Sequence, residues 1–127
     1  MEITKYHSFI AEQFAGIITD HHLVMEVQND HSVELKNDNI GIELFTEYRV
    51  DDALGTVLRN KKNKASYDLS ILPLKKGETD SFAFLTPEED AQALSYGDPI
   101  KELIFIAALI LKKFGSDVLR GDFSALE

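Results

Sequence analysis

The sequence predicts an α+β fold, with an N-terminal helix, an antiparallel meander of about five strands, and C-terminal helices packed on one sheet face. Three observations predict it. Apolar residues recur at helical spacing near the N-terminus, they alternate with polar residues between positions 23 and 72, and two capped helical segments follow position 86. This order of elements favours an antiparallel sheet with one face under helices and the other in solvent.

The first helix begins after Thr4, whose hydroxyl is suited to cap it, and ends near Thr19. Its apolar residues recur every three or four positions: Tyr6, Phe9, Ile10, Phe14 and Ile17. This spacing predicts an amphipathic helix.

The strands follow, because the period of the apolar residues changes to two. We expect five of them, over residues 23 to 28, 32 to 36, 40 to 49, 53 to 60 and 65 to 72. Polar turns separate the strands, and Pro73, which has no N–H to donate to a sheet, closes the fifth.

The C-terminal helices have clear start signals. Thr86, Pro87 and Glu89 form a capping box with proline at the first helical position, and this short helix ends near Tyr96 and Gly97. Asp98 caps a second helix over residues 99 to 114, and Gly115 is suited to a left-handed stop.

This second helix contains nine consecutive apolar residues, at positions 103 to 111. Most of its apolar residues fall on one broad face that extends from Ile106 to Ala108 around the helix, whereas Phe105 and Leu109 lie on the opposite, charged side. Both therefore need cover. Either the first helix or the segment 86 to 96 lies over them, or they form a homodimer contact.

Composition narrows the classes of function. The 127 residues are 44% hydrophobic and suit a single domain over 1–127. The absence of cysteine excludes disulfides and zinc-thiolate sites. A formal net charge of -9 disfavours nucleic acid and favours a basic protein partner. The N-terminus lacks the pattern of an export signal, and no apolar run is long enough to span a membrane, so we expect a cytoplasmic protein without membrane contact.

Chemistry-bearing motifs are absent from the sequence, so we expect no enzyme and no cofactor. The one arrangement that points to a metal is His21, His22 and His31, which the first hairpin would bring together. A metal-dependent enzyme that uses these histidines is the outside alternative. Adjacent residues in a strand point to opposite faces, which argues against it.

Carboxylates gather on the predicted solvent face of the sheet. The alternation places Glu26, Glu34, Glu43 and Glu47 there, and we expect them to form an acidic surface for a protein partner. A basic cluster, Arg59, Lys61, Lys62 and Lys64, is expected at a hairpin tip, where lysines keep a turn soluble and protect a sheet edge, or dock an acidic partner.

Residues 109 to 124, Leu-Ile-Leu-Lys-Lys-Phe-Gly-Ser-Asp-Val-Leu-Arg-Gly-Asp-Phe-Ser, resemble the ending of small uncharacterised bacterial cytosolic α+β proteins, some of them immunity-protein-like. The resemblance implies a helix, a strand meander and a closing helix, and it carries over no functional residue. In size, acidity and element order the chain is also similar to the small acidic dimeric chaperones of bacterial secretion systems.

Together these observations predict a non-enzymatic protein-binding domain. In the immunity-type interpretation, the acidic sheet face neutralises a basic toxin, and charge complementarity speeds the association. In the chaperone-like alternative, a dimer wraps an extended segment along apolar grooves, with binding that depends little on salt.

Overall fold

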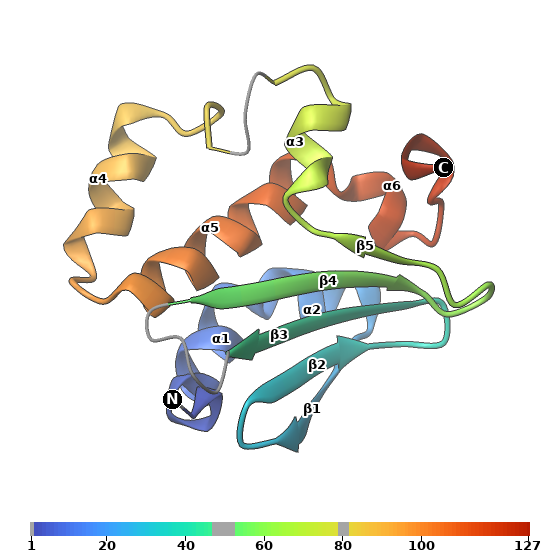
Figure 1. The fold of residues 1–127 in the computed structure, drawn as a ribbon, viewed down its shortest axis with the longest axis horizontal. Helices are drawn as coiled ribbons and strands as arrows, with labels where there is room; N and C mark the ends of the chain where they lie inside the picture. Colours follow the sequence, from blue (N-terminus) through green and yellow to red (C-terminus); the bar gives the residue numbers. More distant parts are fainter. Residues whose placement is uncertain (1, 47–52, 79–81) are drawn as a thin grey trace.

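The computed structural model describes residues 2–46, 53–78 and 82–127 and confirms the predicted α+β fold. Along the chain, a five-stranded antiparallel meander in the order β1-β2-β3-β4-β5 follows an N-terminal helical segment and precedes the C-terminal helices (Figure 1). Each strand pairs with the next one along the chain, and α1 and α2 lie behind β3 and β4 in the view of Figure 1.

The strands are β1 (Val24–Asn29), β2 (Ser32–Lys36), β3 (Ile40–Thr46), β4 (Leu54–Asn60) and β5 (Ser66–Asp68). Their alternation places the apolar side chains of β2 and β3 toward the helices, where Leu35, Ile42 and Leu44 have no exposed surface. Burial of these side chains and of the apolar helix faces forms the core that holds the sheet against the helices.

The N-terminal segment was expected to be one helix and is instead divided in three: a 3-10 turn (Ile3–Tyr6), α1 (His7–Gln13) and α2 (Ala15–His21). The break between α1 and α2 falls at Phe14, whose φ and ψ are -98° and 7°. The prediction that Thr4 caps this helix is wrong, because the turn begins after Glu2 and has no side-chain cap.

The fifth strand is shorter than predicted. After Asp68 the chain turns, because Oδ1 of Asp68 accepts hydrogen bonds from the backbone N–H and the hydroxyl of Ser70, at 2.9 and 2.8 Å. It then enters α3 (Ile71–Lys75), in which Pro73 is the third residue. Proline is tolerated there, since the first turn of a helix has no internal partners for its N–H groups. Pro73 therefore lies inside a helix and does not close a strand.

The two predicted C-terminal helices are confirmed as α4 (Pro87–Ser95) and α5 (Pro99–Phe114), with the capping box of Thr86 and Glu89 in place. A short α6 (Ser116–Leu119) and a 3-10 turn (Ser124–Leu126) follow. No helix in the described part of the chain is both long and apolar enough to cross a lipid bilayer.

Gly115 is not the left-handed stop that the sequence predicts, since its φ is -102°. The chain passes directly from α5 into α6, and the N–H of Gly115 donates to the carbonyl of Leu111 at 2.9 Å. A Cβ atom at this position would lie 2.7 Å from that carbonyl oxygen. Glycine is thus required here for close approach of the backbone.

The side of α5 that carries Phe105 is covered within the chain. Phe105 is only 6% exposed, and its ring centroid lies 5.6 Å from that of Tyr96, which follows α4. Tyr96 in turn makes an edge contact at 5.0 Å with Phe9 of α1. Leu109 is half-buried. The cover over Phe105 therefore comes from the segment that ends in Tyr96, with α1 behind it.

Asp98, which caps the start of α5, makes the stability of the fold depend on pH. The Oδ1 atom of Asp98 accepts from the N–H of Ile100 at 2.9 Å, and Oδ2 accepts from the hydroxyl of Tyr6 at 2.9 Å. Burial alone would raise the pKa of Asp98, but the hydrogen bonds from Tyr6, Ile100 and Lys101 outweigh it and lower the pKa below its ordinary value of 3.8. A lowered pKa means that the ionised carboxylate stabilises the folded state.

We expect Asp98→Ala to lower the free energy of unfolding by about 1 kcal/mol at neutral pH, because the cap of α5 is lost. The contribution of the charge is present above about pH 4 and is lost as pH falls through the lowered pKa. Asp98→Asn keeps a capping oxygen and is the matched control. Urea unfolding at several pH values measures the effect, and equal acid dependence of the wild type and Asp98→Asn would contradict it.

Candidate functional site

The structure brings three of the four predicted glutamates together on the open face of the sheet. Glu26, Glu34 and Glu43 pair directly across β1, β2 and β3 and form a row. Glu47 lies outside the described residues. The predicted clustering is therefore present on three neighbouring strands.

Three cations neutralise this row. Glu34 is 6% exposed, and its carboxylate lies within 4 Å of the side-chain nitrogens of Lys61 (3.2 Å), Arg59 (3.7 Å) and Lys36 (3.9 Å). Arg59 also donates to Glu43 at 2.9 Å. We call these six residues the ion-pair ladder: Glu26, Glu34, Glu43, Lys36, Arg59 and Lys61.

Polar neighbours complete the ladder at its two ends. The hydroxyl of Ser32 donates to Glu43 at 2.6 Å, and the amide of Gln28 donates to Glu26 at 3.1 Å. At the outer end, the hydrogen bond and charge of Lys36 lower the pKa of Glu26, and the hydrogen bond to Glu26 raises the pKa of Lys36. Both shifts favour the charged forms of Glu26 and Lys36.

The ladder is thus a mixed surface with three carboxylates and three cations, and not the acidic surface that the sequence predicts. The sequence predicts Arg59 and Lys61 at a hairpin tip, and Lys36 is a third cation of the ladder that this prediction does not include. The place of Lys36 on this face is predictable, because it lies two positions after Glu34 in the same strand.

Two glycines make room for the side chains on this face. A Cβ atom at Gly41 would lie 2.7 Å from Oε2 of Glu34 and 3.0 Å from Cε of Lys61, so the ion pair passes directly over this glycine. A Cβ atom at Gly55 would lie 2.1 Å from the ring of Phe45. The chain is therefore adapted to hold both Glu34 and Phe45 flat against the sheet.

The predicted gathering of the three histidines is wrong. His21 and His22 precede β1, at the end of the hairpin where the Asn37 side chain donates to the carbonyl of His21. His31 lies in the turn at the other end, beyond six residues of strand, or about 20 Å. In the described part of the chain, no three histidine, aspartate or glutamate side chains are placed to hold a metal ion.

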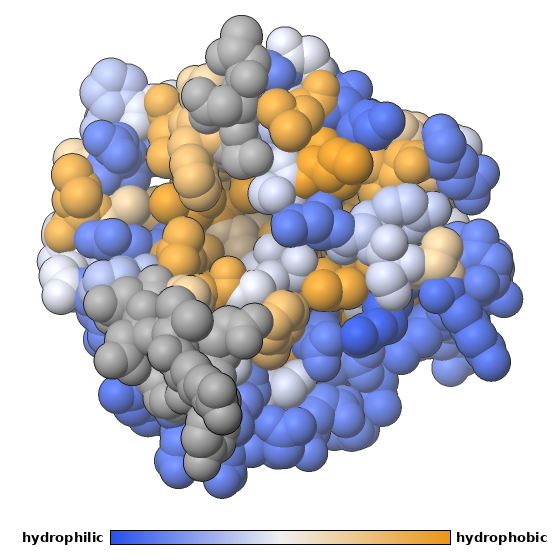
Figure 2. Space-filling view, in the orientation of Figure 1, coloured by the Kyte–Doolittle hydropathy of each residue, from blue (hydrophilic) through white to orange (hydrophobic). Residues whose placement is uncertain are grey.

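A second site lies where α5 crosses the edge of the sheet. Figure 2 shows a hollow on this side of the molecule, bordered by hydrophobic residues. It is a cavity of about 180 Å³ between β4, the turn that follows β5, and α5, and it is open to solvent. We call it the edge cleft, lined by Leu54, Gly55, Thr56, Asp68, Leu69, Ser70, Phe82, Leu103, Ile106, Ala107 and Ile110.

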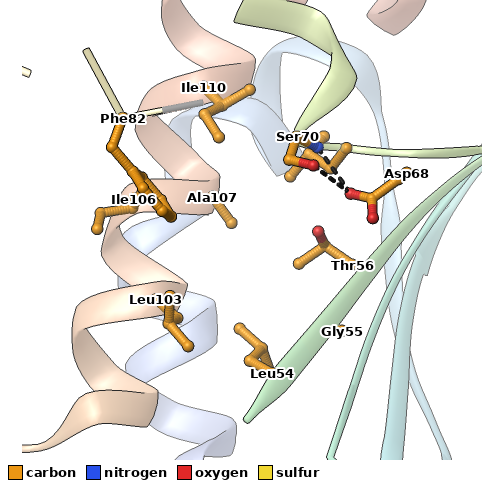
Figure 3. Close-up of a pocket in the computed structure, with 11 residues that line it drawn as sticks. Leu54, Gly55, Thr56, Asp68, Ser70, Phe82, Leu103, Ile106, Ala107 and Ile110 are labelled. Carbon is orange, nitrogen blue, oxygen red and sulfur yellow. Dashed lines mark hydrogen bonds between the residues drawn. The ribbon is translucent and has the colours of Figure 1, made fainter. Parts of the chain in front are cut away.

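The edge cleft has one apolar and one polar wall (Figure 3). Leu103, Ala107 and Ile110 project from α5 toward the sheet, whereas Thr56, Asp68 and Ser70 supply hydroxyl and carboxylate oxygens on the facing side. Such a combination binds the apolar part of a ligand and orients it through a few polar groups.

No pattern in the sequence indicates this cleft. The apolar pattern predicts Leu103 and Ile106 on the core face of the helix, but both are only half-buried, because no side chain of the described residues fills the space in front of them. Phe82 adds a third apolar group at the rim, 51% exposed. The unfilled space depends on where β5 stops, which the apolar pattern did not predict.

Comparison of the chain with protein families, with curated proteins and with solved structures yields no match.

Proposed function

We propose that the protein is a non-enzymatic binding domain that holds an apolar segment of another protein in the edge cleft. The observation that carries the proposal is the incomplete cover of α5. Leu103 and Ile106 belong to its apolar face and remain half-buried beside an open cavity. Apolar surface that remains exposed to solvent in a concave pocket is a common feature of binding sites.

The size of the edge cleft limits what it accepts. An apolar cavity of about 150 Å³ holds one benzene molecule. The 180 Å³ available here therefore suits one large aliphatic or aromatic side chain. Capture of an apolar segment is the activity expected for the chaperone-like class, with which the sequence shares size, acidity and element order.

A peptide-display selection against the immobilised protein tests the proposal. We expect it to recover apolar peptides, and we expect Ile106→Glu to bind a recovered peptide at least about tenfold more weakly, because a carboxylate in the cleft loses hydration when the peptide enters. Leu94→Glu is the matched control, since Leu94 is 64% exposed on α4 and does not line the cleft. Fluorescence anisotropy of the labelled peptide gives the affinities.

Two results would contradict this function. One is equal binding of the peptide to the wild type and to Ile106→Glu, and the other is a selection that recovers no apolar peptide. Circular dichroism of each variant separates loss of binding from loss of fold. Phe82→Ala, at the exposed rim, provides a second variant that leaves the core untouched.

The ion-pair ladder is a second candidate surface, in an immunity-type interaction with a basic toxin. It is favoured by the fixed, in-register positions of its carboxylates, of which the Glu26 side chain is 47% exposed. A partner arginine could replace Lys36 at this carboxylate. Binding at the ladder would weaken steeply with added salt and with Glu26→Lys, whereas binding in the apolar cleft would change little. Salt dependence of the affinity therefore distinguishes the two surfaces.

A further inference from the structure

We infer that the captured segment binds as an additional β-strand on the open part of β4. This inference rests on the proposed function of the edge cleft and specifies the conformation and chemistry of the partner segment. It follows from the unequal lengths of the last two strands. β4 has seven residues, all paired with β3, but β5 has only three.

The pairing between β4 and β5 ends at Val57 and Asp68. Beyond this pair the N–H of Leu69 donates to the carbonyl of Thr56 at 3.3 Å, and the chain then turns away into α3. In the described part of the chain no strand lies beside Leu54 and Gly55 on that side. Among the residues that the structure describes, this edge of the sheet is unpaired, and the edge cleft lies directly against it.

Backbone groups at this edge point toward the cleft. The carbonyl of Thr56 faces the side of β5, because it accepts from Leu69. The N–H and C=O of one residue point to the same side of a strand, and this direction repeats every second residue. The N–H and C=O of Leu54 therefore also face the open edge, where an extended peptide can pair with them.

The direction in which side chains point at this edge also fits an added strand. Leu54 pairs with Thr46, which is buried on the helix side of the sheet, so the residue of an added strand opposite Leu54 also points toward the helices. Its side chain would enter the cleft beside Leu103 and Ile106. The apolar residue in the cleft is thus the same residue whose backbone pairs with Leu54.

The charge of Asp68 sets a second requirement for the partner segment. Oδ1 of Asp68 accepts both hydrogen bonds from Ser70, and Oδ2 has no partner among the described residues. Asp68 is exposed at the end of β5, where an added strand would begin. The expected occupant is therefore an extended segment of a partner protein in which a lysine or arginine precedes a large apolar residue.

Backbone methylation of a peptide tests the strand arrangement separately from capture of the side chain. The probe is an acetylated, amidated peptide with a Lys-Leu pair followed by alternating threonine and valine. Methylation of the leucine N–H removes the hydrogen bond to Leu54 and should weaken binding at least about tenfold. Methylation of the next N–H, which points away from β4, is the matched control and should change the affinity less than about twofold.

The outcomes separate the two proposals. Equal effects of the two methylations, with binding still lost in Ile106→Glu, overturn the added strand and leave the proposed function standing. Binding that is insensitive both to methylation and to Ile106→Glu overturns both.

Asp68→Asn should reduce the preference for lysine over norleucine in the peptide, and an unchanged preference overturns the charge requirement. If light scattering shows a dimer that the peptide dissociates, a second copy occupies the edge, and the inferred partner segment is wrong.

Discussion

Phe105→Ala is expected to lower the free energy of unfolding by about 3 to 5 kcal/mol and to leave the molar mass of the protein in solution unchanged. The side chain is 6% exposed and packs against Tyr96, which packs against Phe9. Its removal leaves a cavity beside the ring of Tyr96 and loses the favourable contact between the two rings. Urea unfolding measures the stability, and light scattering measures the molar mass.

This experiment also decides between the two covers that the sequence allowed for this side of α5. Phe82→Ala is the control, because its ring is 51% exposed and should contribute little to stability. A Phe105→Ala variant of nearly unchanged stability, in which a dimer becomes a monomer, would place the residue at a dimer contact. Loss of stability without a change of mass would place it in the core of one chain.

Glu34→Ala is expected to lower the free energy of unfolding by about 2 kcal/mol. The substitution leaves Lys36, Arg59 and Lys61 close together without their common anion. Removal of one partner of a fully buried ion pair costs about 3 to 5 kcal/mol, and we expect less here because the three cations are about one-third exposed. The loss should shrink at high salt, since salt screens the remaining repulsion.

Two controls belong to this prediction. Glu26→Ala removes the most exposed carboxylate of the ion-pair ladder and should have a clearly smaller effect. Gly41→Ala should destabilise the wild type, because its Cβ would meet Oε2 of Glu34, and should be tolerated better in Glu34→Ala. Additive effects of the two substitutions in a double-mutant cycle would contradict the contact between the carboxylate and this glycine.

Elements specified by neighbouring residues were predictable from the sequence. The capping box of Thr86 and Glu89 and the cap at Asp98 act within one helical turn, and both helices begin where these residues predict. The alternation also placed Glu26, Glu34 and Glu43 correctly on one face. Such signals are local, so they can be recognised without knowledge of the rest of the fold.

Features that depend on distant residues were not predictable in the same way. The end of β5 is a local exception: the apolar pattern of residues 65 to 72 suits a strand, but the side chain of Asp68 binds Ser70, two positions away, and turns the chain after three strand residues. The pairing of Arg59 with Glu43 joins residues 16 positions apart. Where β5 ends determines the edge cleft, and which cations reach Glu34 determines the charge of the ladder, so both sites required the structure.

The short length of β5 also bears on the tendency of the protein to aggregate. An exposed sheet edge is a template for uncontrolled growth of β-structure when it is long and flat. The part of β4 that β5 leaves open comprises two residues, Leu54 and Gly55, or about 7 Å, and α3 follows directly where a longer strand would continue. An edge of this length is long enough for one short segment and too short to support the stacking of chain on chain that forms a fibril.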